Sequence, residues 1–513
     1  MTSKRLLGIV LSLGVLSGCG TLPSLQSRTV SNALPVAEAR DTELGRSLAP
    51  QIRANPGKAG IYTLADPHDA FASRIMLARN AQRTLDVQYY IWHGDMTGTM
   101  LLEALHQAAD RGVRVRLLLD DNNTSGLDAT LAALSMHPNI EVRLFNPFAV
   151  RSPRWVGYLT DFSRLNRRMH NKSFTADNQA TIVGGRNIGD EYFGSTDGVL
   201  FADLDVLVVG PVVNDVSTDF DLYWASESAY PVELLLPQTS SEELQALADS
   251  SSNIEHDPQA KAYVQAIKRS ALIQELRAGK LKLHWSRTRM VSDDPAKALG
   301  RIPDDKLIMH GIEEIVGDPK SEVLLVSPYF VPGEQGAKAF AAMRGRGVDI
   351  RVLTNSLDAT DVSAVHAGYA KRRKPLLRAG VKLYELRRLS PDVGRHVSAG
   401  PFGSSGSSLH AKTFSVDRSH VFVGSFNFDP RSARLNTELG FIIDSPMLAS
   451  EIGDAFRTSI PANSYEVRLD GDDLIWLENH DGKTLRHKTE PGTSIWKRAW
   501  VAFLSLLPID WLL

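Results

Sequence analysis

The feature that most constrains this chain is a motif of reactive residue types that occurs twice. The first copy runs from His170 to Asp177 (HNKSFTAD) and is followed by Gly184-Gly-Arg-Asn187, and the second runs from His410 to Asp417 (HAKTFSVD) and is followed by Gly424-Ser-Phe-Asn427. In both copies Lys stands two residues after His, Asp seven and Asn seventeen. Two matching copies in one chain predict a single site that is built from two halves.

The residue types of the motif suit chemistry at a phosphate. His and Lys two positions apart lie on one face of a β-strand, and the glycines after them let the backbone approach an anion. Each copy thus offers an imidazole, an ammonium and the carboxamide of Asn187 or Asn427. One imidazole can attack phosphorus while the other protonates the leaving oxygen, and this chemistry needs no metal or other cofactor. A single His-x-Lys would indicate no more than a surface or packed pair.

Several segments resemble a known family. The doubled His-x-Lys-x4-Asp motif, with Gly-Gly/Ser-x-Asn behind each copy, is similar to that of the phospholipase D superfamily. The chain resembles bacterial cardiolipin synthases more closely, nearest to the C-type, from about Tyr62 to Leu513. This closer resemblance is carried by LDVQYYIW (85–92), LLLDDNN (117–123), LFNP (144–147), DFSRLNRRMH (161–170) and SFNFDPR (425–431).

The resemblance implies a set of site residues. The catalytic residues would be His170, Lys172, Asp177, His410, Lys412 and Asp417, and the phosphate ligands would be Asn187 and Asn427. Asp177 and Asp417 could instead order the motif loops without touching substrate. Arg186 and Arg431 offer two further guanidinium groups, which would clamp phosphate or form structural ion pairs.

Each catalytic His needs a carboxylate that holds its tautomer and stabilises the imidazolium. In the resembling family this acid often lies well beyond the motif. Glu438, which is 28 residues past His410, and Asp203, which is 33 past His170, fit that position best. Asp205 and Glu191 are rivals for the first half. The sequence leaves open whether each acid serves the His of its own half or that of the other.

The order of predicted strands and helices also repeats. The strand at 322–330 matches that at 85–92, residues 346–353 match 111–118, and 380–385 match 140–145. Alternating strands and helices predict an α/β fold of two pseudo-twofold-related phospholipase-D-type domains, each a mixed, mostly parallel sheet flanked by helices. The expected divisions are 1–19 signal peptide, 20–60 tether, 61–225 first domain, 226–310 linker or insertion, 311–460 second domain and 461–513 C-terminal segment. Within the linker, 281–285 is predicted to be the strand that opens the second half.

The N-terminus predicts an address at a membrane. Lys4 and Arg5 precede an apolar run, 6–16, that is too short for a comfortable membrane span and ends in Leu-Ser-Gly-Cys19. This pattern resembles a bacterial lipoprotein signal, and Cys19 is the only cysteine of the chain. Gly20 stands where an Asp would favour inner-membrane retention. We therefore expect a lipoprotein that faces the periplasm, with the outer membrane favoured over the inner. An ordinary secretory signal or a short anchor is the alternative.

The C-terminal tail, 495–513, is apolar and holds three Trp, yet it is too short and too interrupted to span a bilayer. It suits an interfacial helix with Trp at the depth of the lipid head groups, or alternatively a helix docked on the catalytic domain. The formal net charge of −2 gives no global basic field. Any attraction for phosphate must therefore be local, and we expect no nucleic-acid partner.

The resemblance implies a phosphatidyltransferase that makes cardiolipin by transphosphatidylation through a phosphatidyl-histidine on His170. Phosphatidylglycerol would be the acceptor, and phosphatidylethanolamine or phosphatidylglycerol the donor, sometimes with an accessory protein. The same catalytic set suits a phospholipase D that hydrolyses lipid to phosphatidic acid. A periplasmic nuclease should show a basic groove with aromatic platforms, and a non-enzymatic lipid-binding scaffold would not need intact motifs.

Overall fold

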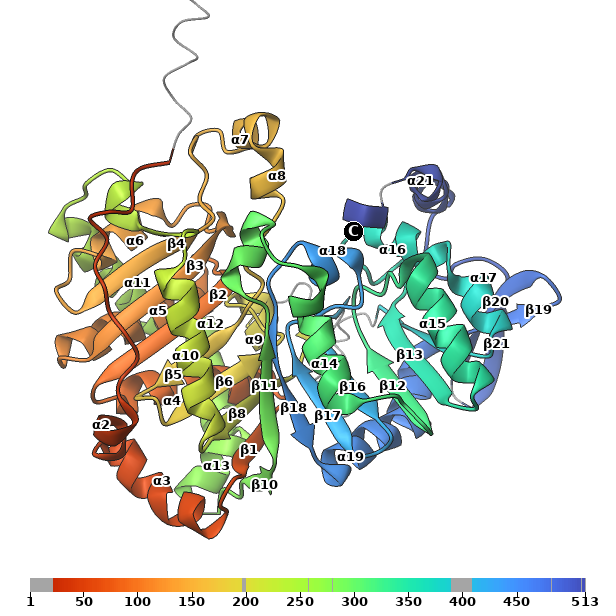
Figure 1. Cartoon of the computed structure of the whole chain (residues 1–513), viewed down its shortest axis with the longest axis horizontal. Coiled ribbons are helices and arrows are strands. Elements are labelled where there is room, and N and C mark those ends of the chain that lie inside the picture. The colour runs from red at the N-terminus through yellow and green to blue at the C-terminus, as the bar shows by residue number, and fades with distance from the viewer. Residues whose placement is uncertain are drawn as a thin grey trace, which may run out of the picture.

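The computed structural model describes residues 22–195, 200–256, 258–278, 280–388, 408–480, 482–508 and 510–512. Two α/β halves lie side by side, the N-terminal half in red to green and the C-terminal half in green to blue (Figure 1). Each half is organised around one large sheet, of nine strands in the first half and ten in the second. Cys19 and the expected signal peptide lie outside the described residues.

The first half alternates strands and helices before it reaches the motif. The tetrapeptide Ser173–Ala176 forms β5, and the apolar run after it returns as β6. Its main elements are β1 (Ala59–Leu64), α4 (Pro67–Asn80), β2 (Thr84–Ile91), α5 (Met96–Asp110), β3 (Arg114–Asn123), α6 (Asp128–Leu134), β4 (Ile140–Phe145), α7 (Trp155–Thr160), α8 (Phe162–Leu165), β5 (Ser173–Ala176), β6 (Ala180–Gly184), α9 (Asp190–Phe193), β7 (Phe201–Ala202), β8 (Asp205–Val209), α10 (Val212–Ala225) and β9 (Ala229–Pro231).

The second half repeats this series, and its motif hairpin is β16–β17. Its main elements are β11 (Thr288–Ser292), α14 (Ile308–Val316), β12 (Glu322–Val326), α15 (Gly333–Gly345), β13 (Asp349–Asn355), α16 (Ser363–Ala370), α17 (Arg373–Arg378), β14 (Lys382–Leu386), β15 (Ser408–Leu409), β16 (Thr413–Val416), β17 (His420–Gly424), α18 (Pro430–Arg434), β18 (Leu439–Asp444), α19 (Pro446–Arg457), β19 (Ser464–Asp470), β20 (Asp473–His480), β21 (Lys483–His487), α21 (Ile495–Leu506) and η5 (Asp510–Leu512).

The strand orders of the two sheets correspond. The first reads β1-β8-β6-β5-β2-β3-β4-β9 and the second β11-β18-β17-β16-β12-β13-β14-β19, with β10 added to one and β20-β21 to the other. This confirms two repeated α/β halves with mixed sheets. The sheets are less parallel than expected, because only β2-β3-β4 and β12-β13-β14 pair in parallel. The motif hairpins and the strands that follow them pair antiparallel, as strands joined by short turns must.

The segment expected as a linker is divided between the halves. Its helices α11 (Ser241–His256), α12 (Pro258–Arg269) and α13 (Ala271–Arg277) cover the first half, where Tyr263 donates a hydrogen bond to the carbonyl of Phe193. The strand expected to open the second half is instead β10 (His284–Ser286), which pairs with β1 of the first sheet. That expectation was wrong because β11, immediately after β10, is the strand that joins the second sheet beside β18.

Residues 22–54 differ from the expected tether. They include the helices α2 (Val36–Arg40) and α3 (Glu43–Ala54), and the extended stretch before them lies against the first half. Arg28 donates hydrogen bonds to the carbonyls of Ala225 and Ser226, and the Asn178 side chain donates to the carbonyl of Leu34. The polar composition that suggests a tether therefore serves hydrogen bonds to the body of the molecule.

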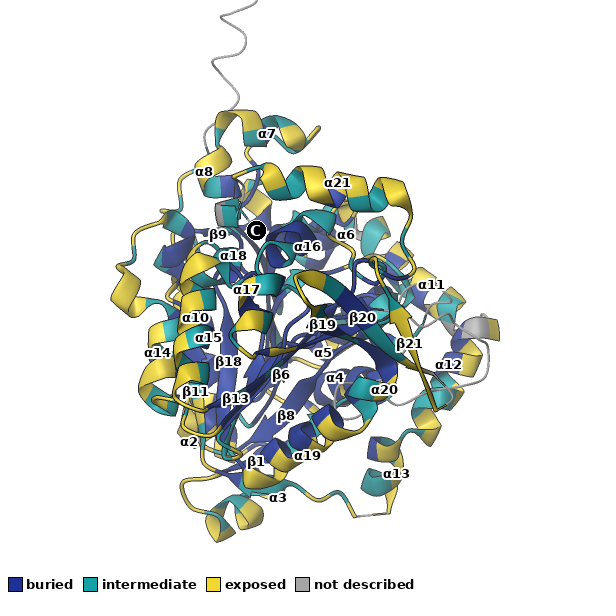
Figure 2. Ribbon diagram, turned by 90° about the vertical axis from the view of Figure 1, so that its right-hand side faces the viewer, coloured by how far each residue is buried: buried dark blue, intermediate teal, exposed yellow. Residues whose placement is uncertain are grey.

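The core continues across the junction of the halves. Figure 2 shows the central strands of both sheets as buried and the edge strand β21 as exposed. One apolar cluster contains Val183 and Val206 of the first half together with Val421 and Val423 of the second. Because these residues belong to the strands beside the motif strands, burying them together brings the two motifs to one interface. Among the described residues, no helix has the length and apolar character to cross a membrane.

Candidate active site

Both motif histidines lie where the parallel strands end. Ser173 pairs with Gln88 near the end of β2, so His170, three residues earlier, reaches the ring of Tyr90 at a centroid distance of 4.9 Å. In the second half, Thr413 pairs with Val326, the last residue of β12. Both rings are nearly buried, at 6% exposure of each residue. The carboxyl ends of parallel strands are a common place for ligands in α/β proteins.

Each histidine is held by backbone of the other half. The His170 amide donates to the carbonyl of Thr437 over 2.9 Å, and the Thr437 amide donates back to the carbonyl of Arg168. The second half makes the same connection, because the His410 amide donates to the carbonyl of Ala202 over 2.8 Å. Here β15 also pairs in parallel with β7. The residue after Thr437 is Glu438 and the residue after Ala202 is Asp203, so each pairing delivers an acid to the opposite histidine.

The side chains complete this exchange. His170 Nδ1 lies 2.8 Å from Glu438 Oε2, and His410 Nδ1 lies 2.6 Å from Asp203 Oδ2. The structure thus brings together the acids and histidines expected from sequence, and each acid contacts the histidine of the other half. The rival Asp205 is instead paired with Arg74 over 2.8 Å. The rival Glu191 lies 3.1 Å from His93.

The two lysines point at the histidines from within their own halves. Lys172 Nζ donates to the carbonyl of His170 over 2.6 Å. Lys412 Nζ donates to the carbonyl of His410 and lies 3.1 Å from Nε2 of the same residue. Both lysines are buried. Burial and the charge of the other lysine lower the pKa of Lys172 to about 7, and burial lowers that of Lys412 to about 8.

The two histidine–acid pairs differ in electrostatics. Burial and the charges of Lys172, Lys412 and His410 hold the pKa of His170 well below its usual range. Burial and Lys412 also lower the pKa of His410, while Asp203 opposes that shift. Because charged groups of one motif shift the pKa of the histidine of the other, the two motifs lie close together.

The two acids also differ in their pKa values. Burial raises the pKa of Glu438 to about 7. Burial would also raise the pKa of Asp203, but the charge and hydrogen bond of His410, with Lys412 beside it, lower that pKa to about 2. Asp203 is therefore ionised throughout the neutral range, whereas Glu438 changes charge within it.

The glycines after the first motif make room for carboxylates. A Cβ on Gly185 would lie 2.1 Å from Asp203 Oδ1, and one on Gly184 would lie 2.2 Å from Asp205 Oδ1. We expected the glycines to admit an anionic ligand, but the anions beside them belong to the protein. In the second half Ser425 follows Gly424 and donates its hydroxyl to Glu438. The site thus has a hydroxyl donor on one acid that the other acid lacks.

The two asparagines are buried, and their partners differ. Asn187 Oδ1 accepts from the amide of Ile91, and its Nδ2 donates to the hydroxyl of Tyr192. Asn427 Oδ1 is buried without a hydrogen-bond partner in the structure. Asn427 Oδ1 is thus an acceptor left free for a donor group, while both polar atoms of the Asn187 side chain are already engaged with neighbours.

Asp177 and Asp417 lie at the opposite ends of their strands from the histidines. Asp177 accepts hydrogen bonds from the amides of Gln82, Arg83 and Thr84, just where β2 begins. Asp417 accepts in the same way from the amides of residues 320–322, where β12 begins. Both residues have positive φ, 53° and 51°, in the turn of the motif hairpin. This arrangement supports the reading in which they order the motif and do not touch substrate.

The two arginines are structural in their contacts. Arg186 donates to the carbonyls of Leu64, Ala65 and Asp203, and it is buried. Arg431 joins the two halves, because it donates to the carbonyl and side chain of Asn166. Of the two alternatives, the clamp on phosphate and the structural contact, these geometries favour the second.

Several residues around the site are not singled out by the motif. The rings of Tyr192 and Phe201 lie 5.2 and 5.1 Å from that of His410. Asp293 is buried, accepts from the Glu438 amide and from Lys297, and so fixes the backbone that carries Glu438. The acidic pair Asp293-Asp294 is the one feature of the sequence that could have indicated the role of Asp293, although such pairs more often lie on solvated loops.

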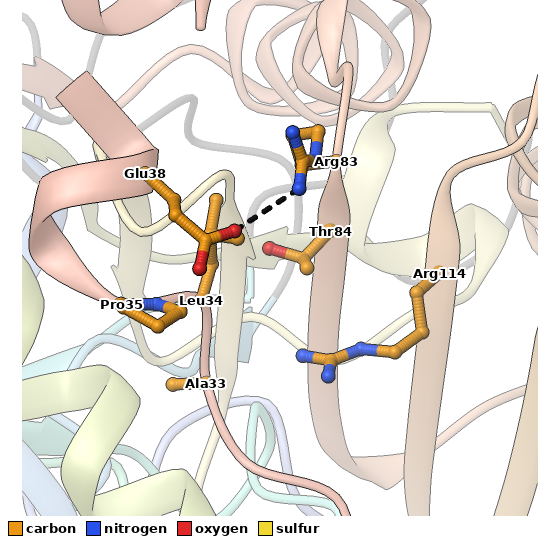
Figure 3. A pocket seen from close by; sticks show the side chains of 7 residues that line it. All are labelled: Ala33, Leu34, Pro35, Glu38, Arg83, Thr84 and Arg114. Atoms are coloured by element: carbon orange, nitrogen blue, oxygen red, sulfur yellow. Dashed lines mark hydrogen bonds and ion pairs between the residues drawn. The ribbon is translucent and has the colours of Figure 1, made fainter. Parts of the chain in front are cut away.

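Two other places lie apart from the histidines. A surface hollow of about 270 Å³ is lined by residues 33–35, Glu38, Arg83, Thr84 and Arg114 (Figure 3). It lies at the beginning of β2, whereas His170 lies near the end of that strand. Elsewhere among the described residues, ligand atoms of His93, Asp95 and Glu191 lie within 4.8 Å of one another. Asp95 there already caps α5 and accepts from the Asp190 amide.

Known proteins that are similar to this chain share one family description. The family model described as "Cardiolipin synthase, PLD-like domain" matches residues 75–224 and 312–460. The chain is 49% identical to cardiolipin synthase C of Escherichia coli over 92% of this chain and 99% of that protein. It is 25% identical to a cardiolipin synthase of Clostridium perfringens over 79% of this chain and 72% of that one.

Among solved structures, the chain resembles the phosphatidylserine synthase of Haemophilus influenzae. The TM-score is 0.56 at 13% identity, and the match covers 91% of this chain and 99% of that one. A likeness at this identity supports the two-half fold alone. The two family-model matches each contain one motif, one histidine and the acid that contacts the other histidine.

Proposed function

This chain belongs to the family of phospholipase-D-like cardiolipin synthases, and from that premise we propose that it makes cardiolipin by transphosphatidylation. Phosphatidylglycerol is the acceptor in this proposal, and phosphatidylethanolamine or phosphatidylglycerol is the donor. The observation that carries the proposal is the pair of crossed contacts, His170 with Glu438 and His410 with Asp203. In this proposal the contacts hold one imidazole to attack phosphorus and the other to donate a proton to the leaving oxygen, as a two-step transfer requires.

In the first step, Nε2 of His170 attacks the phosphorus of the donor. The bond from phosphorus to the head-group oxygen breaks, and His410 gives its proton to that oxygen. The more strongly lowered pKa of His170 supports the nucleophile assignment, because a nucleophile must be neutral. The ionised Asp203 opposes the lowering of the His410 pKa, so His410 holds a proton more readily than His170 does. A phosphatidyl group is then bonded to His170, and the alcohol of the donor is free.

In the second step, His410 takes the proton of the acceptor hydroxyl. The acceptor oxygen attacks phosphorus, the bond from phosphorus to His170 breaks, and cardiolipin leaves. Lys172, Lys412 and the amide Nδ2 of Asn427 donate to the phosphoryl oxygens and stabilise the charge that develops there. A low-polarity surrounding strengthens each of these contacts, and the site residues are buried.

The proposal is tested with purified enzyme in vesicles of phosphatidylglycerol, with and without phosphatidylethanolamine. We expect cardiolipin as the product. Ethanolamine release identifies phosphatidylethanolamine as the donor, and glycerol release identifies phosphatidylglycerol. The matched control is His170→Ala, which should form no product. Phosphatidic acid without cardiolipin would show a hydrolase and would contradict the proposal.

We further propose that acylated Cys19 holds the enzyme at a membrane that faces the periplasm, as the N-terminal pattern predicts. Mass spectrometry of the mature protein should show cleavage before Cys19 and added acyl chains. Cys19→Ala should abolish both. Fractionation of the two membranes then identifies the address, for which Gly20 favours the outer membrane.

A further inference from the structure

The C-terminal helix α21 turns an apolar stripe toward solvent. Trp496, Trp500, Phe503 and Leu506 follow helical spacing on one side, and Trp496 and Leu506 are 81% and 83% exposed. Val501, on the other side, is buried against Leu357 and Ala367 beside α16. The helix is therefore docked by one side while its most apolar side stays uncovered.

A second uncovered apolar group lies in the first half, on α7 and α8. Trp155 and Leu159 are 62% and 75% exposed, and Phe162 is exposed beside them. The inner side of this helical pair is anchored by buried Gly157, next to the side chains of Leu165 and Phe148. Large exposed apolar groups gathered on one part of a surface mark an interaction site more often than scattered ones do.

Both groups lie at the edge that carries the catalytic histidines. The helices α7 and α8 belong to the connection from the end of β4 to His170, and β4 runs parallel to β3 and β2. The helix α21 packs on α16, which follows the end of β13, and β13 runs parallel to β12. Figures 1 and 2 agree, because α7, α8 and α21 lie at the upper end of the molecule in both views.

One side chain connects the two groups to the motif. Arg431, four residues after Asn427, donates to Asn166 just past α8 and to the carbonyl of Leu512 in η5. Lys371 holds the end of α21 by donating to the carbonyl of Leu507 and to Asp510. The two apolar groups are thus fixed on either side of Arg431, at the edge of the sheets where the histidines lie.

The charges beside α21 favour an anionic surface. Lys497 and Arg498 lie on the helix itself, and neither pairs with a carboxylate in the part of the chain that the structure describes. The one acid of the tail among those residues, Asp510, is already paired with Lys371 and Arg372. Aromatic rings next to unpaired cations are typical of segments that lie at the head-group level of a bilayer.

We propose that these two groups form one membrane-docking face, made of Trp155, Leu159, Phe162, Trp496, Trp500, Phe503 and Leu506. Its partner is the surface of a phospholipid bilayer that contains anionic lipid. The inference rests on the proposed function, since a phospholipid must leave the bilayer to reach buried histidines. With a group on each half, docking turns the edge that carries the histidines of both halves toward the lipid surface.

Tryptophan fluorescence tests the orientation of the full-length chain without any turnover. The probe is a vesicle of phosphatidylglycerol and phosphatidylethanolamine whose acyl chains carry bromine, which quenches nearby tryptophan. We expect quenching that falls by at least half in the double variant Trp496→Phe, Trp500→Phe, which keeps the face apolar. Trp285→Phe, on β10 at the opposite edge, should leave the quenching unchanged. No quenching, or quenching that the double variant keeps, would overturn the docking face even if the protein is held by a lipid anchor.

Activity tests the same face in a second way. The variant Trp155→Ser, Leu159→Ser, Trp500→Ser, Phe503→Ser should lose at least 10-fold in rate on vesicles. It should keep the wild-type rate on short-chain phospholipid dissolved as monomers. The matched control is Val36→Ser with Met447→Ser, which changes exposed apolar residues of α2 and α19 at the other edge. Equal losses on both substrates, or an equal loss in the control, would contradict the proposal. If no variant or wild-type protein makes cardiolipin, the fluorescence result still stands alone.

Discussion

The two halves share their strand order but support their motifs by different means. In the first half, Asp205 follows the crossing acid by two residues and is buried between Arg74 and Arg186, at 2.8 and 3.5 Å. In the second half the residue two beyond the crossing acid is Gly440, where a Cβ would lie 2.4 Å from the ring of Phe422. An ionic group thus supports one motif hairpin and an aromatic cluster the other.

Some features of the site occur in both halves, and others occur in only one. Both halves keep the His-x-Lys pair, the crossed acid and the carboxylate that orders the motif turn. They differ in the acid itself and in its neighbour, Gly185 beside Asp203 and Ser425 beside Glu438. A symmetric fold therefore holds two histidines in unlike surroundings, which a reaction with one nucleophile and one acid needs.

The largest expected effect separates the roles of the two histidines. With His170→Ala or His410→Ala, we expect cardiolipin formation to fall by about 10⁴-fold or more, because nucleophile and general acid act as one unit. The His410→Ala variant should still carry a phosphatidyl group on His170 after brief mixing with a donor whose leaving group needs no proton. Mass spectrometry of the digested protein measures this adduct. An adduct on His410 in the His170→Ala variant would reverse the assignment.

The next effect separates the two acids by their pH dependence. Asp203 has a pKa of about 2, so Asp203→Asn should cost about 10³-fold in rate to the same extent at pH 6 and pH 8. Glu438 has a pKa of about 7, so its carboxylate forms as the pH rises through 7 and then makes His170 more nucleophilic. Glu438→Gln should therefore cost little at pH 6 and about 10-fold at pH 8.

The unfolding temperature gives an independent check on the pKa of Glu438. The folded pKa of Glu438 is raised from its ordinary value of 4.5 to about 7, so the stability that its neutral form contributes is complete below 4.5 and is lost as the pH rises from there to about 7. The Glu438→Gln variant should accordingly unfold at a higher temperature than wild type at pH 8, and at nearly the same temperature at pH 4.5. Equal pH profiles of rate in the two acid variants would contradict the proposed difference between the halves.

Much of this site could be predicted because it is written in local spacing. His170, Lys172 and their counterparts were identified by their spacing alone, although the structure places them just before β5 and β16 and not on a strand, and Glu438 and Asp203 were the preferred acids. The crossing of the acids could not be predicted, because it depends on the backbone contacts of Thr437 and Ala202 with the other half. Nothing in local sequence encodes a hydrogen bond between segments more than two hundred residues apart.

Some parts of the fold could be predicted from the sequence, and others could not. The repeat identified both halves, but periodicity could not tell a parallel strand from an antiparallel one, so the sheets were expected to be too parallel. Residues 22–54 and the helices α11–α13 have polar compositions, which indicate linkers. They fold because the first half offers them hydrogen bonds and an apolar surface, as with Tyr263 packed on Phe71. Such support is tertiary, and a polar composition alone does not reveal it.

The ionic support of the first half predicts a large loss of stability on breaking it. Asp205→Asn leaves Arg74 buried without its carboxylate, and we expect the free energy of unfolding to fall by about 3 kcal/mol. The double variant Asp205→Asn, Arg74→Met removes both charges and should recover part of that loss. Urea unfolding monitored by circular dichroism measures both. A double variant no more stable than the single one would show that the ion pair is not what holds this hairpin.

The aromatic support of the second half predicts a smaller loss of a different kind. At Gly440 the approach of the Phe422 ring leaves no space for a methyl group, and that ring is stacked on Phe414 at 4.9 Å. Gly440→Ala must therefore displace a packed ring, which costs about 2 kcal/mol in a close-packed core. A smaller partner should relieve the clash, so Gly440→Ala combined with Phe422→Leu should be more stable than the sum of the two single changes. This coupling is steric, whereas that of Asp205 with Arg74 is electrostatic. Strictly additive losses in the second half would mean that the backbone yields at Gly440, and that the two halves are held less differently than their contacts indicate.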